Sequence, residues 1–483
     1  MADSTPAFAD ATAAAAAIRA GALSAEELTR HTLQRIERFN PALNAVVTLL
    51  PEQALRQARQ ADAQRSRGRT TGPLHGVPIT IKDIYAVAGA RTTQGLPALA
   101  GQVCPRDAVA VARLRAAGAI IIGLTNVPPG STDWITRNPV FGQTNNPWDP
   151  ARTPGGSSGG CAAALAAGLS YLSLGSDVAG SIRIPAHFCG IFGHKTSVGV
   201  IPLNGAFARP DPPPGAVDNF MHVAGSLARS AADLMTALKI TGGPHGAEAA
   251  AYRWRLPPPR AAQLAGYRIG FVLDDPLCPV VPAVKERLAT ALTALADAGV
   301  ALREGWPPGV DSQRQLAAYE SLLNIDLHGD MDLQPAAALR RLRRQADGDY
   351  QALRAAQLLR PLRQHLAILR QRDALRAAWS RYFETCDAFV MPVTFTPAIA
   401  HDANRSGTIA TAAGPRPYGD LLFWNAAAAL SGLPATAAPI GLAGSLPVGL
   451  QVMAPYLEDA TAIDIAGRIT ALLGGAPQPP PYW

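Results

Sequence analysis

Short apolar runs rich in β-branched residues alternate with helical patterns along this chain of 483 residues. Residues 77–81 and 119–123 are expected to form strands, and a helical pattern over 107–117 lies between them. Because a helix linking two strands is typical of parallel pairing, the alternation predicts an α/β sheet that is at least partly parallel. After about residue 265 the alternation resumes, with strands expected over 267–273, 388–391, 435–440 and 448–453 and helices over 281–298, most of 312–383, and 460–473.

Helical patterns also open the chain. Ser24 and Glu27 have the spacing of a capping box, and a second helical stretch is expected after Pro51. The first residues are rich in alanine and lack a basic segment, which indicates a helix rather than a signal peptide. The apolar run over 421–440 is interrupted by asparagine, glycine and proline, so no membrane span is expected.

The amino-acid composition excludes several classes of protein. Hydrophobic residues make up 48% of the chain and charged residues 16%, which excludes wholesale disorder. The net charge of +7 is thinly spread, and Arg340, Arg341, Arg343 and Arg344 indicate a solvated helix face, so no nucleic-acid partner is expected. Five cysteines, an odd number without CxxC spacing, argue against a disulfide framework and a zinc site and fit the reducing cytoplasm.

Lysine is rare in this chain. Of the 43 basic residues only 4 are lysine, and the other 39 are arginine. The lysines are Lys82, Lys195, Lys239 and Lys285. Arginine can replace a lysine on the surface, but it cannot replace one that must lose its proton. The four lysines are therefore positions at which to look for proton chemistry.

A segment rich in glycine and serine, residues 153–168, allows four interpretations. A flexible linker is disfavoured because the segment is short and leads directly into an apolar helix. A Walker-type phosphate loop lacks its GK[ST] ending. Gly155, Ser157 and Gly159 satisfy the G-x-S-x-G pattern of a nucleophile elbow, but prolines precede them where a strand is required. The fourth interpretation is a backbone held by glycines so that it presents serine hydroxyls and amide N–H groups.

A second segment, residues 175–195, supports the fourth interpretation. Ser181 follows small residues whose successive N–H groups can converge on one point, as an oxyanion requires. A serine nucleophile needs a base. His187 and His194 lie beside apolar runs and are better explained as packed core residues. Lys82 ends a predicted strand, faces away from Asp83, and can act as a base if burial lowers its pKa from about 10.4 to near 7.

These segments together resemble the amidase signature family. The resemblance rests on VPITIKD at 77–83, PGGSSGG followed by alanines at 154–167, and GSDVAGSIRIPA at 175–186, and it is strongest from about 70 to 240. It implies a twisted mixed β-sheet flanked by α-helices on both faces. It also implies one amidase domain over 1–483, with an N-terminal helical part at 1–70, the signature core at 70–240, and a C-terminal α/β part at 241–483.

The resemblance implies a Ser–Ser–Lys triad. Ser181 would be the nucleophile, Ser157 the bridging serine after a cis peptide bond, and Lys82 the terminal base. The N–H groups of Val178, Ala179, Gly180 and Ser181 would form the oxyanion hole. Ser158, Asp177 and Arg183 would support these loops. No metal or organic cofactor is implied, and a homodimer is what the family suggests.

The function expected from the sequence is hydrolysis of a carbon–nitrogen bond in a small neutral or hydrophobic amide, through an acyl-enzyme on Ser181. Trp134 and Trp424 have two open interpretations: they line the substrate pocket, or they pack in the core. The first alternative is the glutamine-hydrolysing component of a tRNA-dependent amidotransferase. That group usually has glutamine where this chain has Ile184, which argues against it. A non-catalytic binding protein is disfavoured because Lys82, Ser157 and Ser181 are all present.

Overall fold

A computed structural model describes residues 6–207, 221–327, 334–344, 350–403, 407–411, 414–479 and 482. Its centre is an 11-stranded sheet with the order β1-β3-β2-β6-β8-β7-β14-β15-β11-β9-β10. The strands are β1 (Val46–Leu49), β2 (Pro78–Lys82), β3 (Ile120–Thr125), β6 (Leu172–Asp177), β7 (Phe192–Lys195), β8 (Val223–Ala228), β9 (Arg268–Phe271), β10 (Ala301–Glu304), β11 (Ala388–Pro392), β14 (Ala435–Ala443) and β15 (Leu446–Met453).

The sheet is mixed, which confirms the α/β fold expected from the sequence. Strand β2 pairs in parallel with β3 and β6, and β9 pairs in parallel with β10 and β11. In the middle of the sheet the strands follow the order β6-β8-β7-β14-β15, and each neighbouring pair in this series is antiparallel. Two short hairpins, β4 (Arg137–Asn138) with β5 (Gly142–Gln143) and β12 (Thr408–Thr411) with β13 (Gly414–Pro417), lie outside this sheet.

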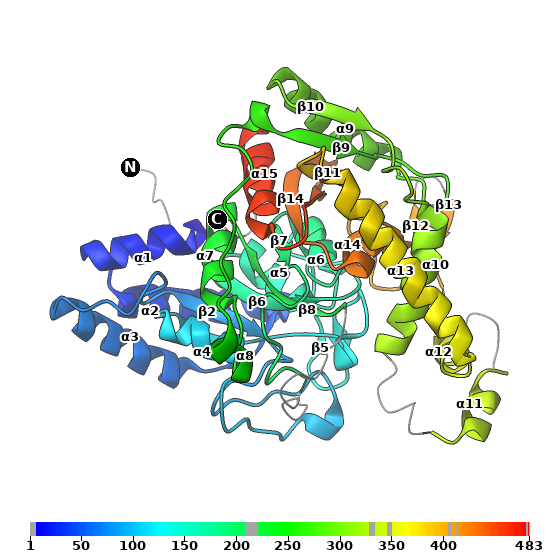
Figure 1. Ribbon diagram of the computed structural model, residues 1–483. Helices are drawn as coiled ribbons and strands as arrows, with labels where there is room; N and C mark the ends of the chain where they lie inside the picture. The colour runs from blue at the N-terminus through cyan, green and yellow to red at the C-terminus, as the bar shows by residue number, and fades with distance from the viewer. Residues whose placement is uncertain are drawn as a thin grey trace.

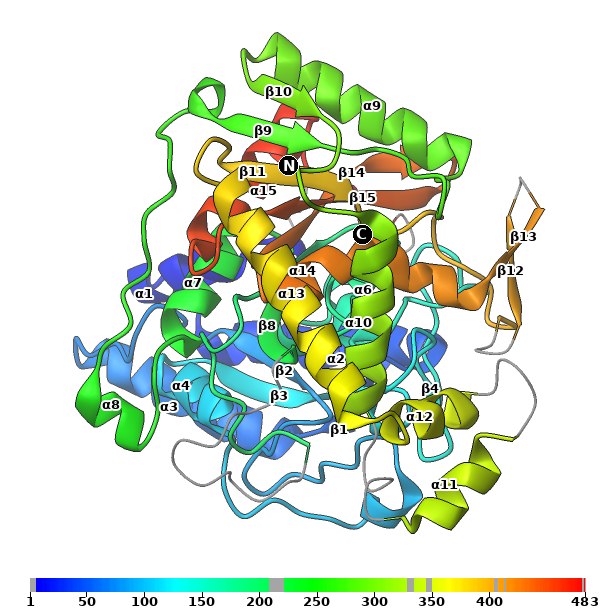
Figure 2. The same cartoon turned by 45° about the vertical axis from the view of Figure 1, so that its right-hand side comes forward.

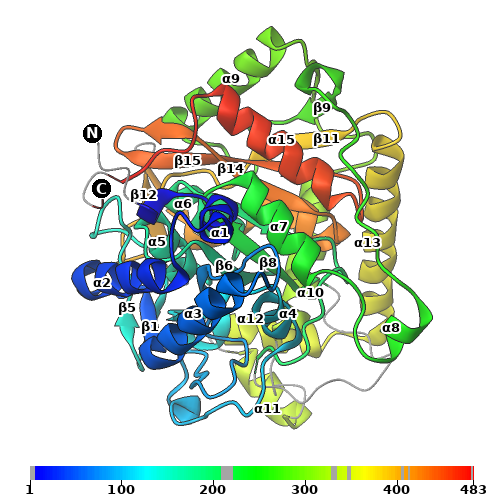
Figure 3. The same ribbon diagram turned by 90° about the vertical axis from the view of Figure 1, so that its left-hand side faces the viewer.

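Helices cover both faces of the sheet (Figures 1 and 3). On one face, α3 (Pro51–Ser66), α7 (Ala231–Thr241) and α15 (Asp459–Leu472) pack on the strands. On the other face, α5 (Gly159–Ala166) and α6 (Arg183–Cys189) pack on the same part of the sheet. Strands β2, β3 and β6 to β8 are buried along their whole length because both of their faces are covered.

Long helices from the C-terminal half lie beyond α5 and α6. Helices α10 (Ser312–Asp326) and α13 (Leu362–Tyr382) lie side by side, and α10 also contacts α12 (Tyr350–Leu358) and α14 (Ala426–Ser431) (Figure 2). The remaining helices are α1 (Ala11–Ala20), α2 (Ala25–Leu43), α4 (Val109–Ala116), α8 (Ala247–Ala251), α9 (Pro282–Asp297) and α11 (Ala336–Leu342).

The predicted capping box and the solvent-exposed arginine cluster are confirmed. The Ser24 hydroxyl accepts from the Glu27 amide at 3.0 Å, and the Glu27 carboxylate accepts from the Ser24 amide at 3.0 Å, so the capping box starts α2. The arginines at 340, 341, 343 and 344 are exposed, and the five cysteines are free and buried. Within the described ranges, no helix is long and apolar enough to cross a membrane.

Candidate active site

Lys82 is the last residue of β2 and is completely buried. Its Nζ donates to Oγ of Ser157 at 2.7 Å and to Oγ of Ser176 at 2.9 Å, and it forms no ion pair with any described residue. Asp83 does not pair with Lys82, as expected, and accepts from the Thr93 hydroxyl at 2.6 Å. Burial lowers the pKa of Lys82 to about 7, since the charged ammonium loses its hydration.

Ser157 lies in the glycine-rich loop that precedes α5. The Gly156–Ser157 peptide bond is cis, and Gly155 has a φ of +85° that favours glycine. A Cβ on Gly156 would lie within about 3 Å of the Trp134 backbone and would contact the carbonyl oxygen of Asp133. The loop therefore needs glycine at 156, because the 133–134 segment approaches it directly.

Ser181 lies between β6 and α6. The Ser158 amide donates to the Ser181 carbonyl at 3.1 Å, and this bond ties the two serine loops together. Ser181 is only 6% exposed, and its exposed part faces a cavity of about 380 Å³. The β6–α6 loop, the glycine-rich loop before α5 and the end of β2 thus bring Ser181, Ser157 and Lys82 into one region of the molecule.

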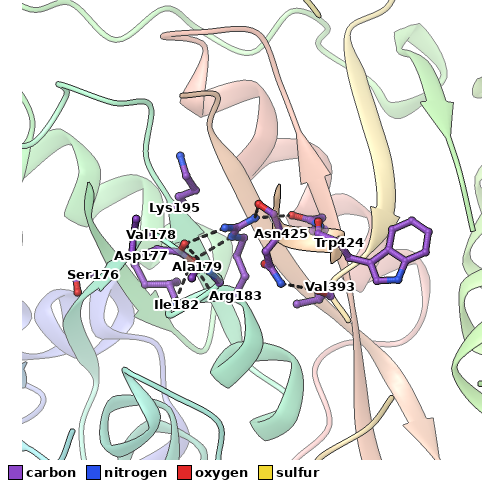
Figure 4. Close-up of polar contacts among 12 residues, drawn as sticks. Ser176, Asp177, Val178, Ala179, Ile182, Arg183, Lys195, Val393, Trp424 and Asn425 are labelled. Carbon is purple, nitrogen blue, oxygen red and sulfur yellow. Dashed lines mark hydrogen bonds and ion pairs between the residues drawn. The ribbon is translucent and has the colours of Figure 1, made fainter. Parts of the chain in front are cut away.

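A buried ion pair holds the β6–α6 loop. Arg183 donates from Nη2 to Oδ1 of Asp177 at 2.8 Å and from Nε to Oδ2 at 3.1 Å (Figure 4). Another guanidinium nitrogen, Nη1, donates to Oε1 of Gln451 at 3.0 Å. Burial by itself would raise the pKa of the Asp177 carboxyl, but the Arg183 guanidinium overcomes this and holds that pKa well below its usual range.

The four expected oxyanion donors do not all point the same way. The Gly180 N–H donates to Oδ1 of Asp177 at 3.0 Å, so in this conformation it is not directed at the cavity. Gly180 is also absent from the cavity wall, whereas Val178, Ala179 and Ser181 line it. The oxyanion hole proposed below is therefore built from the N–H groups of Val178, Ala179 and Ser181, whereas the Gly180 amide and Asp177 hold the loop.

The two tryptophans lie in different places. Trp134 lines the cavity, donates from Nε1 to the Ala179 carbonyl at 2.8 Å, and packs against the Tyr418 ring. Trp424 is buried outside the cavity wall, next to Trp306 and Phe423, with its indole pointing away from the Asp177–Arg183 pair (Figure 4). For Trp424 the core interpretation therefore fits the structure, and the pocket interpretation does not.

Comparisons with known proteins decide the family. The Amidase family model matches residues 27–463 of this chain. The chain belongs to the amidase signature family. An indoleacetamide hydrolase of Bradyrhizobium diazoefficiens is 33% identical over 459 residues, which cover 94% of this chain and 84% of that protein. The A component of the glutamyl-tRNA(Gln) amidotransferase of Thermus thermophilus is 33% identical over 467 residues, which cover 92% and 93% of the two chains.

Solved structures show the same fold. A 6-aminohexanoate cyclic dimer hydrolase in complex with its substrate superimposes on this chain with a TM-score of 0.79 and 25% identity. The match covers 99% of this chain and 100% of that one. The mixed sheet with helices on both faces is therefore the amidase-signature fold expected from the sequence motifs.

The two histidines considered as bases have packing roles. His187 is buried, and both of its ring nitrogens contact backbone groups of Gly449 and Thr396. Burial lowers the pKa of His187 to about 4, so it is neutral in the core. His194 contacts Thr436 and Asp459, far from the serine loops in sequence. The core interpretation of both histidines is confirmed.

Lys195 is the second buried lysine of the chain. Its Nζ donates to the carbonyls of Thr196 at 3.1 Å and Leu433 at 2.9 Å. Burial lowers its pKa to about 7 as well. Because its described partners are backbone carbonyls and no serine, Lys195 joins β7 to the start of β14 and has no nucleophile to activate.

Sequence reasoning missed two residues that contact the candidate site. Ser176, the second partner of Lys82, lies in β6 directly before Asp177, and β6 pairs with β2. Predicting β6 as a strand beside β2 would have brought Ser176 near Lys82. Tyr319 in α10 donates to the Val178 carbonyl at 2.8 Å. No local pattern marks Tyr319, since its contact spans 141 residues of sequence.

Proposed function

We propose that this amidase hydrolyses the carbon–nitrogen bond of a small amide through an acyl-enzyme on Ser181. The observation that carries the proposal is Lys82, a buried lysine without an ion-pair partner among the described residues, whose Nζ lies 2.7 Å from Oγ of Ser157. A lysine with a pKa of about 7 is neutral in half of the molecules at that pH. It can therefore accept a proton, which an ordinary surface lysine at neutral pH rarely does.

The proposed reaction uses the residues in series. Neutral Lys82 accepts the hydroxyl proton of Ser157, and Ser157 accepts the hydroxyl proton of Ser181. The Oγ of Ser181 attacks the carbonyl carbon of the substrate as it loses this proton. The N–H groups of Val178, Ala179 and Ser181 stabilise the oxyanion. The relay then runs backwards and protonates the leaving nitrogen as the carbon–nitrogen bond breaks. Water hydrolyses the ester on Ser181 by the same proton path, which restores the free hydroxyl.

We propose that the substrate is small and neutral or hydrophobic. The cavity of about 380 Å³ matches a small molecule, and Trp134, Leu323, Leu327 and Leu422 supply apolar parts of its wall. An indole ring of a substrate such as indoleacetamide would find aromatic neighbours in Trp134 and Tyr418. The relative that hydrolyses indoleacetamide makes this amide the first one to test.

The proposed setting is the cytoplasm, as a homodimer and without a cofactor. The five buried, free cysteines support a reducing compartment. Among the described residues no cluster of His, Cys, Asp or Glu is arranged to hold a metal ion. EDTA is therefore expected to leave the activity unchanged.

A panel of aliphatic, aryl and peptide amides and esters, with indoleacetamide included, tests the function. Wild type is expected to hydrolyse at least one amide, whereas Ser181→Ala and Lys82→Ala are expected to be inactive on the same compound. Hydrolysis by Ser181→Ala at the wild-type rate would show that the acyl-enzyme proposal is wrong.

A glutamine-hydrolysing amidotransferase component is the second candidate, because such proteins are up to 33% identical over most of this chain. Two charged side chains in the cavity wall, Glu320 and Arg360, could meet the charged groups of free glutamine. Ile184, where that group usually has glutamine, is completely buried in α6 and argues against it. Glutaminase activity that rises with tRNA and partner proteins would favour this candidate.

A further inference from the structure

Two successive carbonyl groups of the β6–α6 loop accept hydrogen bonds from side chains outside the signature motifs. The Tyr319 hydroxyl of α10 donates to the Val178 carbonyl at 2.8 Å. The Trp134 indole, from the segment after β3, donates to the Ala179 carbonyl at 2.8 Å. On the same loop, the Gly180 amide donates to Asp177 at 3.0 Å. The Val178–Ala179 and Ala179–Gly180 peptide groups therefore each form at least one hydrogen bond that restricts their rotation.

Fixing the Val178 carbonyl also fixes the Ala179 amide. In a trans peptide the C=O and N–H groups point in opposite directions across a rigid plane. Tyr319 is completely buried and is not part of the cavity wall, whereas Val178 and Ala179 line the cavity. The Val178 carbonyl thus points into the protein towards Tyr319, and the Ala179 N–H points away from Tyr319.

Tyr319 remains a donor at every pH at which the protein is active. Burial raises the pKa of its hydroxyl well above the ordinary value, so the proton stays in place. The side chain is completely buried, which limits its movement. A buried hydroxyl that donates to one carbonyl restricts the orientation of that carbonyl, because hydrogen bonds prefer a narrow range of angles.

The same helix forms a wall of the cavity. Ala317, Glu320, Ser321 and Asn324 of α10 line it, at the spacing of one helix face. A substrate in the cavity would therefore contact α10 directly next to the residue that holds the Val178 carbonyl.

We infer that Tyr319 is a positioning residue for the oxyanion hole: its hydroxyl holds the Val178–Ala179 peptide so that the Ala179 N–H faces the substrate carbonyl. Trp134 holds the next carbonyl, that of Ala179, and so helps to fix the conformation of the same loop. The inference rests on the proposed function, since it assumes that Ser181 is the nucleophile. Tyr319 does not touch the reacting atoms and acts only through the loop.

Tyr319→Phe tests the inference because it removes one hydroxyl and keeps the ring. The readout is the rate at which a fluorophosphonate probe modifies Ser181, located by peptide mass spectrometry. In this reaction the Ser181 oxygen bonds to phosphorus, fluoride leaves, and the serine proton is taken up by the base, so no amide substrate is needed. The developing charge on the phosphoryl oxygen uses the same N–H donors as an amide would.

We expect Tyr319→Phe to react about tenfold more slowly than wild type, a smaller loss than the 10²–10³ typical of removing an oxyanion donor altogether. For the best amide of the panel, kcat is expected to fall by a similar factor while KM changes by less than about twofold. The matched control is Tyr267→Phe, which removes another buried hydroxyl, bonded to Asp464 and Ala261, and should react like wild type.

Each outcome has one meaning. Equal labelling rates for wild type and Tyr319→Phe, with both folded by circular dichroism, overturn the role of Tyr319 and leave the proposed function intact. A wild type that is modified at a residue other than Ser181, or not at all, overturns the proposed function and the inference with it. If Tyr319→Phe does not fold, Tyr319→Met, which also lacks the hydroxyl, takes its place, and an unchanged labelling rate in that variant overturns the inference.

Discussion

At the scale of single residues, the proposed chemistry depends on a buried lysine whose hydrogen bonds go to hydroxyl groups and not to a carboxylate. Lys82 is surrounded by hydroxyl groups of Ser157 and Ser176 and forms no ion pair with a described residue. Hydroxyls can hydrogen-bond to either form of the amine, so burial dominates the balance and lowers the pKa to about 7. An aspartate in place of either serine would stabilise the charged form and remove the base.

The pH dependence of kcat/KM follows from this pKa. Lys82 acts as a base only in its neutral form, so activity is expected to be low below pH 6, to rise through about pH 7, and to reach a plateau above pH 8. The measurement is kcat/KM between pH 5 and 9.5 in buffers of constant ionic strength. A rate that falls as the pH rises through 7 would contradict the assignment of Lys82 as base.

Replacing Lys82 by arginine separates the need for a base from the need for a positive charge. Lys82→Arg is expected to be as inactive as Lys82→Ala, with a loss of at least about 10³ in kcat/KM, because a guanidinium keeps its proton. Lys239→Arg, at an exposed position of α7, is the control and should keep wild-type activity. Substantial activity in Lys82→Arg would show that Lys82 contributes charge only.

Ser176 is expected to orient the Lys82 amine towards Ser157. Ser176→Ala removes one of the two side-chain acceptors of Nζ, so kcat/KM should fall by about fivefold, as expected for one lost hydrogen bond of about 1 kcal/mol. The Ser176 hydroxyl accepts from the charged Lys82 amine and thereby stabilises it, so its removal should lower the pKa of Lys82. The midpoint of the pH profile should therefore move to lower pH. Ser173→Ala, in the same strand but bonded to Thr80, is the control. An unchanged rate and midpoint in Ser176→Ala would exclude this role.

At the scale of elements, the β6–α6 connection is held by one buried ion pair. Asp177 accepts from the Gly180 and Ile182 amides and from Arg183, so it fixes the loop on which Ser181 lies. Asp177→Asn would leave the Arg183 charge buried without compensation. We expect the free energy of unfolding to fall by about 3–5 kcal/mol, measured by urea denaturation, together with most of the activity.

The control for Asp177→Asn is a surface ion pair. Asp274→Asn breaks the pair with Lys285, whose side chains are 38% and 49% exposed, and should cost at most about 1 kcal/mol. Equal losses of stability in the two variants would show that the Asp177–Arg183 pair contributes no more than an exposed pair.

Sequence patterns located some elements better than others. The strands β2 and β3 were predicted because they are continuous runs of apolar, mostly β-branched residues. Strands β7 and β8 were missed because they contain glycine, histidine, serine and lysine. Gly193 is needed there because a Cβ would lie 2.8 Å from side-chain atoms of Ala186 and Ile182, so close packing of α6 on the sheet selects against the usual strand residues.

At the scale of the whole molecule, the sequence predicted the family and the composition of the candidate triad better than its surroundings. The serine loops and the lysine strand are local motifs, whereas the cavity wall combines segments near 131–134, 178–181, 317–327 and 418–422. Only the fold brings such distant segments together, which explains why Tyr319 and Ser176 were missed and why Trp424 was considered for the pocket. The orientation of the Gly180 amide also depends on a backbone turn that residue types do not reveal.

The central claim is that Ser181 forms a covalent acyl intermediate. Its most direct test is intact-protein and peptide mass spectrometry after acid quenching during turnover of a slowly hydrolysed aryl ester or amide. The account predicts an adduct with the mass of the acyl group on the peptide that contains Ser181, present in wild type and absent in Ser181→Ala. An acyl adduct on any other residue, or hydrolysis by Ser181→Ala at an undiminished rate, would contradict it.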